Sequence, residues 1–301
     1  MWAHPRPVAG NPLLATLATP EAFRGIVLVV LSASVFAVVD GLSKVLADTQ
    51  SVGQIVCARY AVALPVIVLL TPRAEWRGLF RTANPLHQIV RGLMPIGVSI
   101  LMVLAVRYLP LAEATVILFA APFLVVALAG PLLGEHVHRA SWIGVAVGFA
   151  AVLLVARPGF GDISWYALFP LAAAVFYALY QLATRGLANK GEPPRTTLVW
   201  TLTTGTIIAT PLALATWEPV STTAWLLMLS LGLVFGLAQF LMIQAYAHAP
   251  AGVLAPFAYA QIVSATVVGF VFFAAVPDLW TLVGVAMIVA AGVHLARLQQ
   301  R

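Results

Sequence analysis

Ten apolar stretches in two sets of five constrain this chain of 301 residues more than any other feature. A helix needs about 20 apolar residues to cross the hydrocarbon core of a bilayer. The first set covers residues 24–47, 52–71, 86–106, 110–133 and 141–157, and the second covers residues 163–185, 195–216, 222–247, 251–274 and 277–297. The sequence therefore predicts an all-α integral membrane protein with ten transmembrane helices.

The composition agrees with this class. Hydrophobic residues make up 62% of the chain and charged residues only 9%, and the mean hydropathy is +1.00. A water-soluble domain of this size cannot hide so much apolar surface. We find no zinc-protease, phosphate-loop or nucleophile-elbow pattern. The sequence therefore predicts no catalytic residues, no cofactor and lipid as the main surroundings.

The two sets of stretches are related by a constant offset of 140 residues. Phe36 then corresponds to Phe176, and Pro110 to Pro250, without a gap. A repeat with five crossings must insert its second copy upside down relative to its first. We therefore expect a tail over residues 1–23, a first five-helix repeat over residues 24–157 and a second, inverted repeat over residues 158–301 around a central cavity.

Basic residues at the span ends predict the orientation, because Lys and Arg gather on the cytoplasmic side. With both termini in the cytoplasm, the inner segments hold eleven basic residues and the outer ones hold two, Arg107 and Arg157. The eleven inner residues are Arg6, Arg24, Arg73, Arg77, Arg81, Arg139, Arg185, Lys190, Arg195, Arg297 and Arg301. The net charge of +6 then reflects the excess of basic residues on the cytoplasmic side. Because these residues are scattered over several loops, nucleic acid is not expected as a partner.

Two motifs resemble a known family. Residues 107–114 read RYLPLAEA, with Pro122 and an LLGE sequence at residues 132–135 after them. In the second repeat, residues 255–259 read APFAY, with Gln261 and then Pro277 and Asp278. Both motifs resemble the drug/metabolite transporter superfamily in its EamA-type branch. Among the members of known structure, the chain resembles the bacterial exporter of aromatic and other amino acids. The second repeat departs from the pattern at Ala275, which stands where Glu135 stands in the first.

The resemblance implies ten helices around a central cavity, with the fifth and tenth at the periphery and available for dimer contacts. Members of this superfamily also move nucleobases, riboflavin, S-adenosylmethionine and drugs, so the resemblance does not choose the cargo. A monomer and a homodimer both remain open.

The first span holds the strongest candidate site. Asp40 and Lys44 lie one turn apart, and charges inside a membrane usually face the bundle interior. In one interpretation Asp40, with Phe36 and Lys44 nearby, meets a cationic group of the cargo or a proton. In the other, Asp40 and Lys44 form a structural pair and Lys44 extends to the outer interface.

Two arginines are candidates for structural or coupling charges. A guanidinium stays charged, so Arg59 in the second span must find an acid, carbonyl groups, water or a cargo carboxylate. A partner such as Asp40 would make Arg59 structural. Arg91 starts the third span, where we expect an anchor that extends to the cytoplasmic interface, with a gate as the alternative.

Aromatic and amide side chains in the second repeat are the remaining candidates for cargo binding. They are Tyr177 and Tyr180 in the sixth span, Gln239 and Tyr246 in the eighth, and Tyr259 in the ninth. Such groups suit an apolar or aromatic cargo through ring contacts. Ordinary bundle packing is the alternative for each of them.

Prolines, glycines and histidines suggest further features. We expect hinges at Pro122 and Pro256, since proline removes a backbone donor. The glycine spacings 144–148 and 232–236 allow close helix contacts, with internal packing favoured over a dimer contact. His136 and His138 are two residues apart on a turn, which predicts solvated side chains and no metal site.

These observations together predict a secondary transporter in the bacterial inner membrane. The cargo expected is an amino acid, aromatic or otherwise neutral, or a similar small metabolite, exported by alternating access. A carrier of another metabolite or drug is the first alternative. A membrane-embedded enzyme and a channel are weaker ones, because no catalytic cluster and no polar pore ring are evident.

Overall fold

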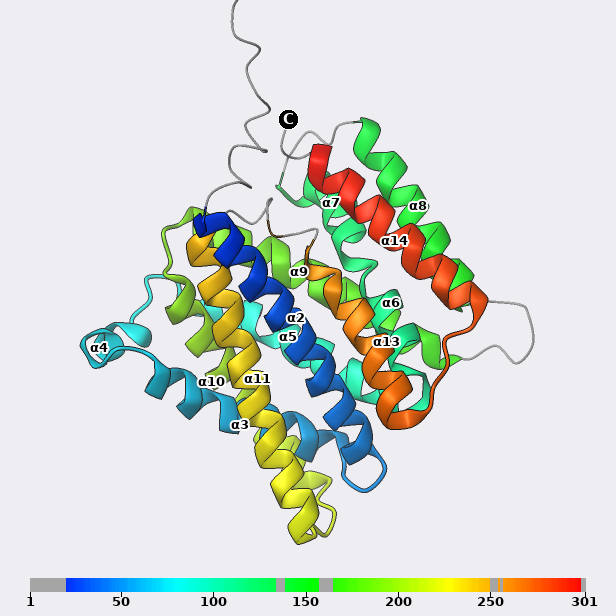
Figure 1. The fold of residues 1–301 in the computed structure, drawn as a ribbon. Coiled ribbons are helices and arrows are strands. Elements are labelled where there is room, and N and C mark those ends of the chain that lie inside the picture. The colour runs from blue at the N-terminus through cyan, green and yellow to red at the C-terminus, as the bar shows by residue number, and fades with distance from the viewer. Residues whose placement is uncertain (1–19, 134–138, 157–164, 250–253, 255–256, 299–301) are drawn as a thin grey trace, which may run out of the picture.

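The computed structural model describes residues 20–133, 139–156, 165–249, 254 and 257–298, and every regular element in these ranges is helical (Figure 1). The first half contains α2 (Pro20–Ala47), α3 (Val52–Leu70), η1 (Arg73–Glu75), α4 (Trp76–Leu79), α5 (Pro85–Tyr108), α6 (Leu111–Leu118), α7 (Ala121–Leu133) and α8 (Arg139–Ala156). The second half contains η2 (Trp165–Ala167), α9 (Leu168–Asn189), α10 (Pro194–Ala215), α11 (Thr222–His248), α13 (Ala260–Phe273) and α14 (Leu279–Leu298).

The helices follow the predicted apolar stretches. In the described residues, seven helical segments are long and apolar enough to cross a membrane, and three shorter apolar helices cover Trp142–Val155, Ala260–Phe273 and Leu279–His294. These three coincide with the predicted fifth, ninth and tenth spans. The all-helical membrane class is thus confirmed.

The predicted fourth span is interrupted. Helix α6 ends at Leu118 and α7 begins at Ala121, so Pro122 lies in the first turn of a new helix. A proline is tolerated there because the first backbone N–H groups of a helix lack intrahelical acceptors. Helix α13 likewise begins only at Ala260, after Tyr259. At the offset of 140, Tyr259 corresponds in sequence to Phe119, the residue that follows α6. The two rings are in contact, with centroids 5.2 Å apart.

Helices from the two halves interleave. Helix α2 packs along α11, α3 along α10 and α5 along α9, while α8 and α14 lie side by side at one edge of the molecule (Figure 1). Glycines permit the closest crossings. A Cβ at Gly232 of α11 would lie 2.3 Å from Val62 Cβ of α3, and one at Gly148 of α8 would lie 2.3 Å from the Phe123 ring of α7. These two glycines therefore serve internal packing, as expected.

Loops fasten the bundle at both faces. We call the face on which α2 begins the N-terminal face. On the opposite face, Gln54 donates to the Glu218 carbonyl at 2.9 Å and accepts from the Glu218 backbone N–H at 3.1 Å. On the N-terminal face, Glu192 between α9 and α10 accepts from Thr82 and Asn84, which precede α5. Buried charged residues, among them Asp40, Arg59 and Arg91, lie between these two faces.

Candidate functional site

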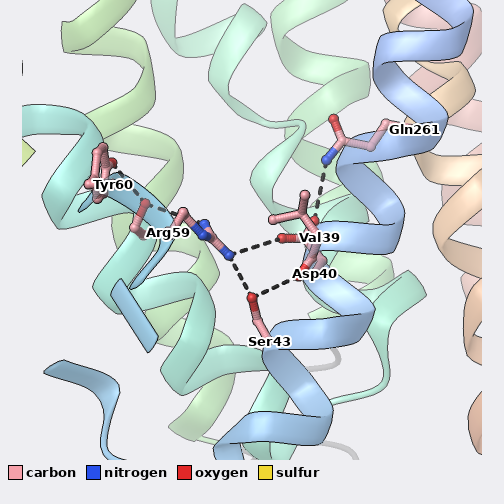
Figure 2. Close-up of polar contacts among 7 residues, drawn as sticks. Val39, Asp40, Ser43, Arg59, Tyr60 and Gln261 are labelled. Atoms are coloured by element: carbon pink, nitrogen blue, oxygen red, sulfur yellow. Dashed lines mark hydrogen bonds and ion pairs between the residues drawn. The ribbon is translucent and has the colours of Figure 1, made fainter. Parts of the chain in front are cut away.

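An acid and an arginine meet in the interior between α2 and α3. Asp40 is 8% exposed and Arg59 is 5% exposed, and Oδ1 of Asp40 lies 3.9 Å from an Nη atom of Arg59. Gln261 of α13 donates to Oδ2 of Asp40 at 3.4 Å. Figure 2 shows Arg59 reaching from α3 toward α2, with Gln261 on another side of the carboxylate. The interior thus holds a charge pair from two helices with an amide from a third.

Serine hydroxyls hold the arginine more closely than the acid does. Arg59 donates to Ser43 Oγ at 2.7 Å and to Ser99 Oγ at 3.3 Å, and Ser43 donates to the Val39 carbonyl at 2.8 Å. The hydroxyl groups of Ser99 and Tyr60 are 3.0 Å apart. Nε of Arg59 is buried without a hydrogen-bond partner among the described residues. A small displacement of Asp40 therefore leaves Arg59 with neutral partners only.

Aromatic rings complete the surroundings of Arg59. Its guanidinium lies 5.4 Å from the centroid of the Phe235 ring, a cation–π contact. Phe36, predicted to line the site, packs edge-on against the same ring with centroids 6.0 Å apart, and Tyr60 does so at 5.7 Å. Phe36 is thus adjacent to the charged network.

Lys44 does not pair with Asp40. Its Nζ donates to the carbonyls of Val106 at 2.5 Å and Leu109 at 2.8 Å, at the end of α5. The structural pair considered for Asp40 and Lys44 is therefore wrong, since the cation nearest Asp40 is Arg59. The negative end of the α5 dipole favours an ammonium at this position. Lys44 ties α2 to α5 at the face opposite the N-terminal one.

Arg91 is not an interfacial anchor, and this prediction is wrong. Arg91 is 3% exposed. Its guanidinium donates to Thr184 Oγ1 at 2.7 Å, Thr201 Oγ1 at 2.6 Å, the Thr197 carbonyl at 3.2 Å and the Tyr180 hydroxyl at 2.8 Å. Its guanidinium also lies 4.4 Å from the centroid of the Tyr180 ring. Hydroxyls and a carbonyl of α9 and α10 keep the charge inside the bundle.

Three of the predicted tyrosines come together. Tyr177 and Tyr180 of α9 stack with centroids 6.1 Å apart, and Tyr246 of α11 lies close enough to interact electrostatically with both. We call Tyr177, Tyr180 and Tyr246 the tyrosine trio. Tyr177 is 36% exposed and Tyr246 is 50% exposed. The trio therefore presents ring surface from both α9 and α11 that the rest of the bundle does not cover.

The remaining residues predicted to bind cargo, Gln239 and Tyr259, are not part of the trio. Gln239 is half-buried on α11. Tyr259 is 6% exposed, and a Cβ at Gly292 of α14 would meet its hydroxyl at 2.0 Å, so the ring packs toward the peripheral helices. Pro256, Glu135, His136 and His138 lie outside the described residues. Within the described residues, no cluster of three or more His, Cys, Asp or Glu could hold a metal ion.

Glu192 is a buried carboxylate outside the membrane-spanning helices. Its Oε1 accepts from Thr82 Oγ1 at 2.8 Å, Asn84 Nδ2 at 2.9 Å and the Ala83 N–H at 3.1 Å, and Gln88 donates to Oε2 at 3.4 Å. These donors, with Asn84 contributing most, hold the pKa of Glu192 below its usual range. The ionised carboxylate therefore fastens the loop before α5 to the loop before α10.

This arrangement predicts a pH-dependent stability. A carboxyl with a lowered folded pKa contributes stability that is fully present above the usual glutamate pKa of about 4.3 and is lost as the pH falls through the folded value. We expect Glu192→Gln to lower the melting temperature at pH 7 and to leave a smaller difference from the unmodified chain below about pH 4. Thermal unfolding of both proteins in detergent at the two pH values checks this, and an unchanged difference would contradict it.

Several residues of the network escaped sequence analysis. Ser99, Tyr60, Thr197 and Thr201 were not singled out, although each supplies an oxygen to a buried network. Glu192 was also missed. Polar side chains inside apolar spans were the available signal, but which of them face an arginine depends on contacts between distant helices.

Comparison with known proteins assigns the chain to a family. The EamA-like transporter family model matches residues 23–157 and again residues 164–296. The chain belongs to the EamA-like transporter family. Its family and its relatives are membrane transporters, so the buried polar groups of this EamA-like protein belong to a multi-pass transporter of the drug/metabolite superfamily.

Named relatives carry different cargo. The pseudopaline exporter CntI of Pseudomonas aeruginosa strain PAO1 is 31% identical over 278 residues, which cover 91% of this chain and 96% of the exporter. A riboflavin transporter of Rhizobium johnstonii is 33% identical over 64% of both chains. An S-adenosylmethionine uptake transporter of Rickettsia prowazekii is 24% identical over 76% of both chains. These relatives support a metabolite transporter and do not select an amino acid.

A crystal structure supports the fold. It is 22% identical to this EamA-like protein, covers 94% of this chain and 99% of its own, and superposes with a TM-score of 0.63. At this identity the likeness concerns the fold alone.

Proposed function

We propose that this protein is a secondary transporter that exports amino acids, aromatic and other neutral ones first, or similar small metabolites, across the bacterial inner membrane by alternating access. One observation carries the proposal: a bundle from a transporter family buries an Asp40–Arg59 pair and also carries the partly exposed rings of the tyrosine trio. Ionic groups and aromatic rings suit a small zwitterion with an apolar side chain.

The helix contacts support two inverted five-helix repeats. At the offset of 140, α2 corresponds to α9 and α5 to α11, so the packing of α2 on α11 and of α5 on α9 is the same contact seen twice. The family model also matches once in each half. Ten crossings, residues 24–157 and 158–301 as the two repeats, and both termini in the cytoplasm complete this proposal.

The two faces differ, which supports alternating access. At the face opposite the N-terminal one, α2 packs on α5 and Lys44 bonds to the end of α5. The corresponding helices α9 and α11 do not pack in this way along their described residues. Tyr246, the counterpart of Val106, is 50% exposed, whereas Val106 is 1% exposed. We therefore propose that this conformation is open toward the cytoplasm and closed toward the outside.

The proposed cargo and direction draw on different support. The relative that covers 91% of the chain is named an exporter, which supports export. An amino acid is proposed from the mixture of acid, arginine and tyrosine side chains in the interior. Riboflavin and S-adenosylmethionine, named for other relatives, are the second candidates. For the assembly we propose a monomer or a homodimer through the peripheral α8 and α14.

Transport itself is the test. Purified protein is reconstituted into proteoliposomes loaded with unlabelled phenylalanine, and entry of labelled phenylalanine is followed over time. We expect saturable counterflow that empty liposomes lack. Riboflavin and S-adenosylmethionine are tested in parallel as second candidates. Chemical conversion of a compound without its movement would indicate a membrane-embedded enzyme and would contradict the proposal.

A further inference from the structure

Arg91 is a buried cation without a carboxylate partner. Its four hydrogen bonds go to three hydroxyls and one carbonyl, and no ion pair of the described residues includes it. Arg59, in contrast, has Asp40 at 3.9 Å. Glu192 does not pair with Arg91 either. It accepts hydrogen bonds from Gln88, Thr82, Ala83 and Asn84. The interior near Arg91 is therefore positively charged.

Arg91 contacts the tyrosine trio through a hydrogen bond to Tyr180. The Tyr180 oxygen accepts a hydrogen bond from Arg91 at 2.8 Å, so its single proton remains available for donation. No acceptor for that proton occurs among the described residues. A hydrogen bond accepted from a cation polarises the O–H group and strengthens the bond it donates. Tyr180 is thus prepared as a donor to an anionic oxygen.

The donor is not fully covered by the rest of the protein. Tyr180 is partly exposed, stacks on Tyr177 and lies near Tyr246, whose ring is 50% exposed. A ligand group that reaches this exposed surface can therefore meet both the phenol and the aromatic faces. A carboxylate there would also compensate the charge of Arg91, because an unpaired buried charge is unfavourable in a low dielectric.

We propose that the cargo carries a carboxylate, that Tyr180 donates a hydrogen bond to it, and that Arg91 is the positioning residue that sets this preference through Tyr180. This inference rests on the proposed transport function and deepens it by naming the chemical group that is recognised. Thr184 and Thr201 support it by holding the guanidinium in place from α9 and α10.

A matched pair of ligands tests the preference. Phenylalanine and phenylalaninamide share the ring and the ammonium group and differ in the carboxylate. Their dissociation constants for the full chain in detergent are measured by thermal stabilisation and by calorimetry. Hydrogen bonds to charged groups are worth a factor of about 10 or more in affinity, so we expect phenylalanine to bind at least about tenfold more tightly than its amide.

Two variants locate the preference. Tyr180→Phe keeps the ring and removes the donor, and we expect it to reduce the ratio between acid and amide to below about threefold. Arg91→Lys keeps a charge and loses the planar fork of donors, and we expect a reduced ratio as well. Tyr108→Phe is the matched control, because Tyr108 stacks on Tyr166 at the far end of α5, and it should keep the full ratio.

The outcomes separate this inference from the transport proposal. Equal binding of acid and amide would overturn the carboxylate preference, and a full ratio in Tyr180→Phe would overturn the role of Tyr180 in it. Either result would leave an amino-acid carrier intact. Binding of neither compound would contradict the amino-acid cargo itself, and the inference with it. A reduced ratio in a variant whose ligand-free melting temperature is unchanged supports the inference, because a purely structural role would not change discrimination.

Discussion

Arg59→Met is expected to lower the free energy of unfolding by about 3–5 kcal/mol, because it leaves Asp40 buried without its cation. Asp40 is 8% exposed and keeps only the 3.4 Å contact with Gln261 among its described hydrogen bonds and ion pairs. Ser43 and Ser99 also lose a donor. Unfolding in a denaturant series, with the protein in detergent micelles, measures the change.

Two further variants sharpen this test. Arg107→Met removes an exposed arginine at the end of α5 and should change the free energy of unfolding by less than about 0.5 kcal/mol. Combining Asp40→Asn with Arg59→Met removes both charges, so we expect the double variant to regain a large part of the lost stability. Strictly additive losses in the double variant would show that the two charges do not interact.

Asp40→Asn alone is expected to reduce counterflow at least about tenfold, a barrier increase of about 1.4 kcal/mol or more. Asparagine retains an oxygen that can accept from Gln261 and Arg59, so the fall in melting temperature should be smaller than for Arg59→Met. The transport loss would follow from removal of a charge that meets the cargo or a proton. Counterflow and thermal unfolding are measured on the same preparations.

Asp48→Asn is the control for this variant, since Asp48 is an exposed carboxylate just beyond the end of α2. It should leave transport close to that of the unmodified chain. Parallel losses of transport and stability in Asp40→Asn, equal to those of Arg59→Met, would instead assign Asp40 a purely structural role beside Arg59.

The spans could be predicted well because the hydrocarbon thickness fixes the length of an apolar helix. The predicted range 52–71, for example, became Val52–Leu70, and 195–216 became Pro194–Ala215. The interruption between α6 and α7 was not predicted. Pro122 indicated a special position, but hydropathy stays high across Phe119 and Ala120, so no loss of apolar character marked the break.

The candidate site was predictable in its members more than in its pairings. Spacing along one helix suggested Asp40 with Lys44, whereas the structure brings Arg59 from the next helix to Asp40 and sends Lys44 to α5. A position at the start of a span suggested an interfacial Arg91. The hydroxyls that accept hydrogen bonds from Arg91 belong to α9 and α10, about 90 and 110 residues further along the chain. Only tertiary packing brings these helices to Arg91.

Cysteine accessibility at two matched positions tests alternating access most directly. Cys57 is the single cysteine, so Cys57→Ser provides a background for Val106→Cys and Tyr246→Cys, which the offset of 140 relates. In membrane vesicles, a membrane-impermeant thiol reagent should label position 246 from the cytoplasmic side only and position 106 from the outer side only. Added cargo should change the two labelling rates in opposite directions. Labelling of both positions from the same side, or rates that rise and fall together, would contradict a carrier built from two inverted halves.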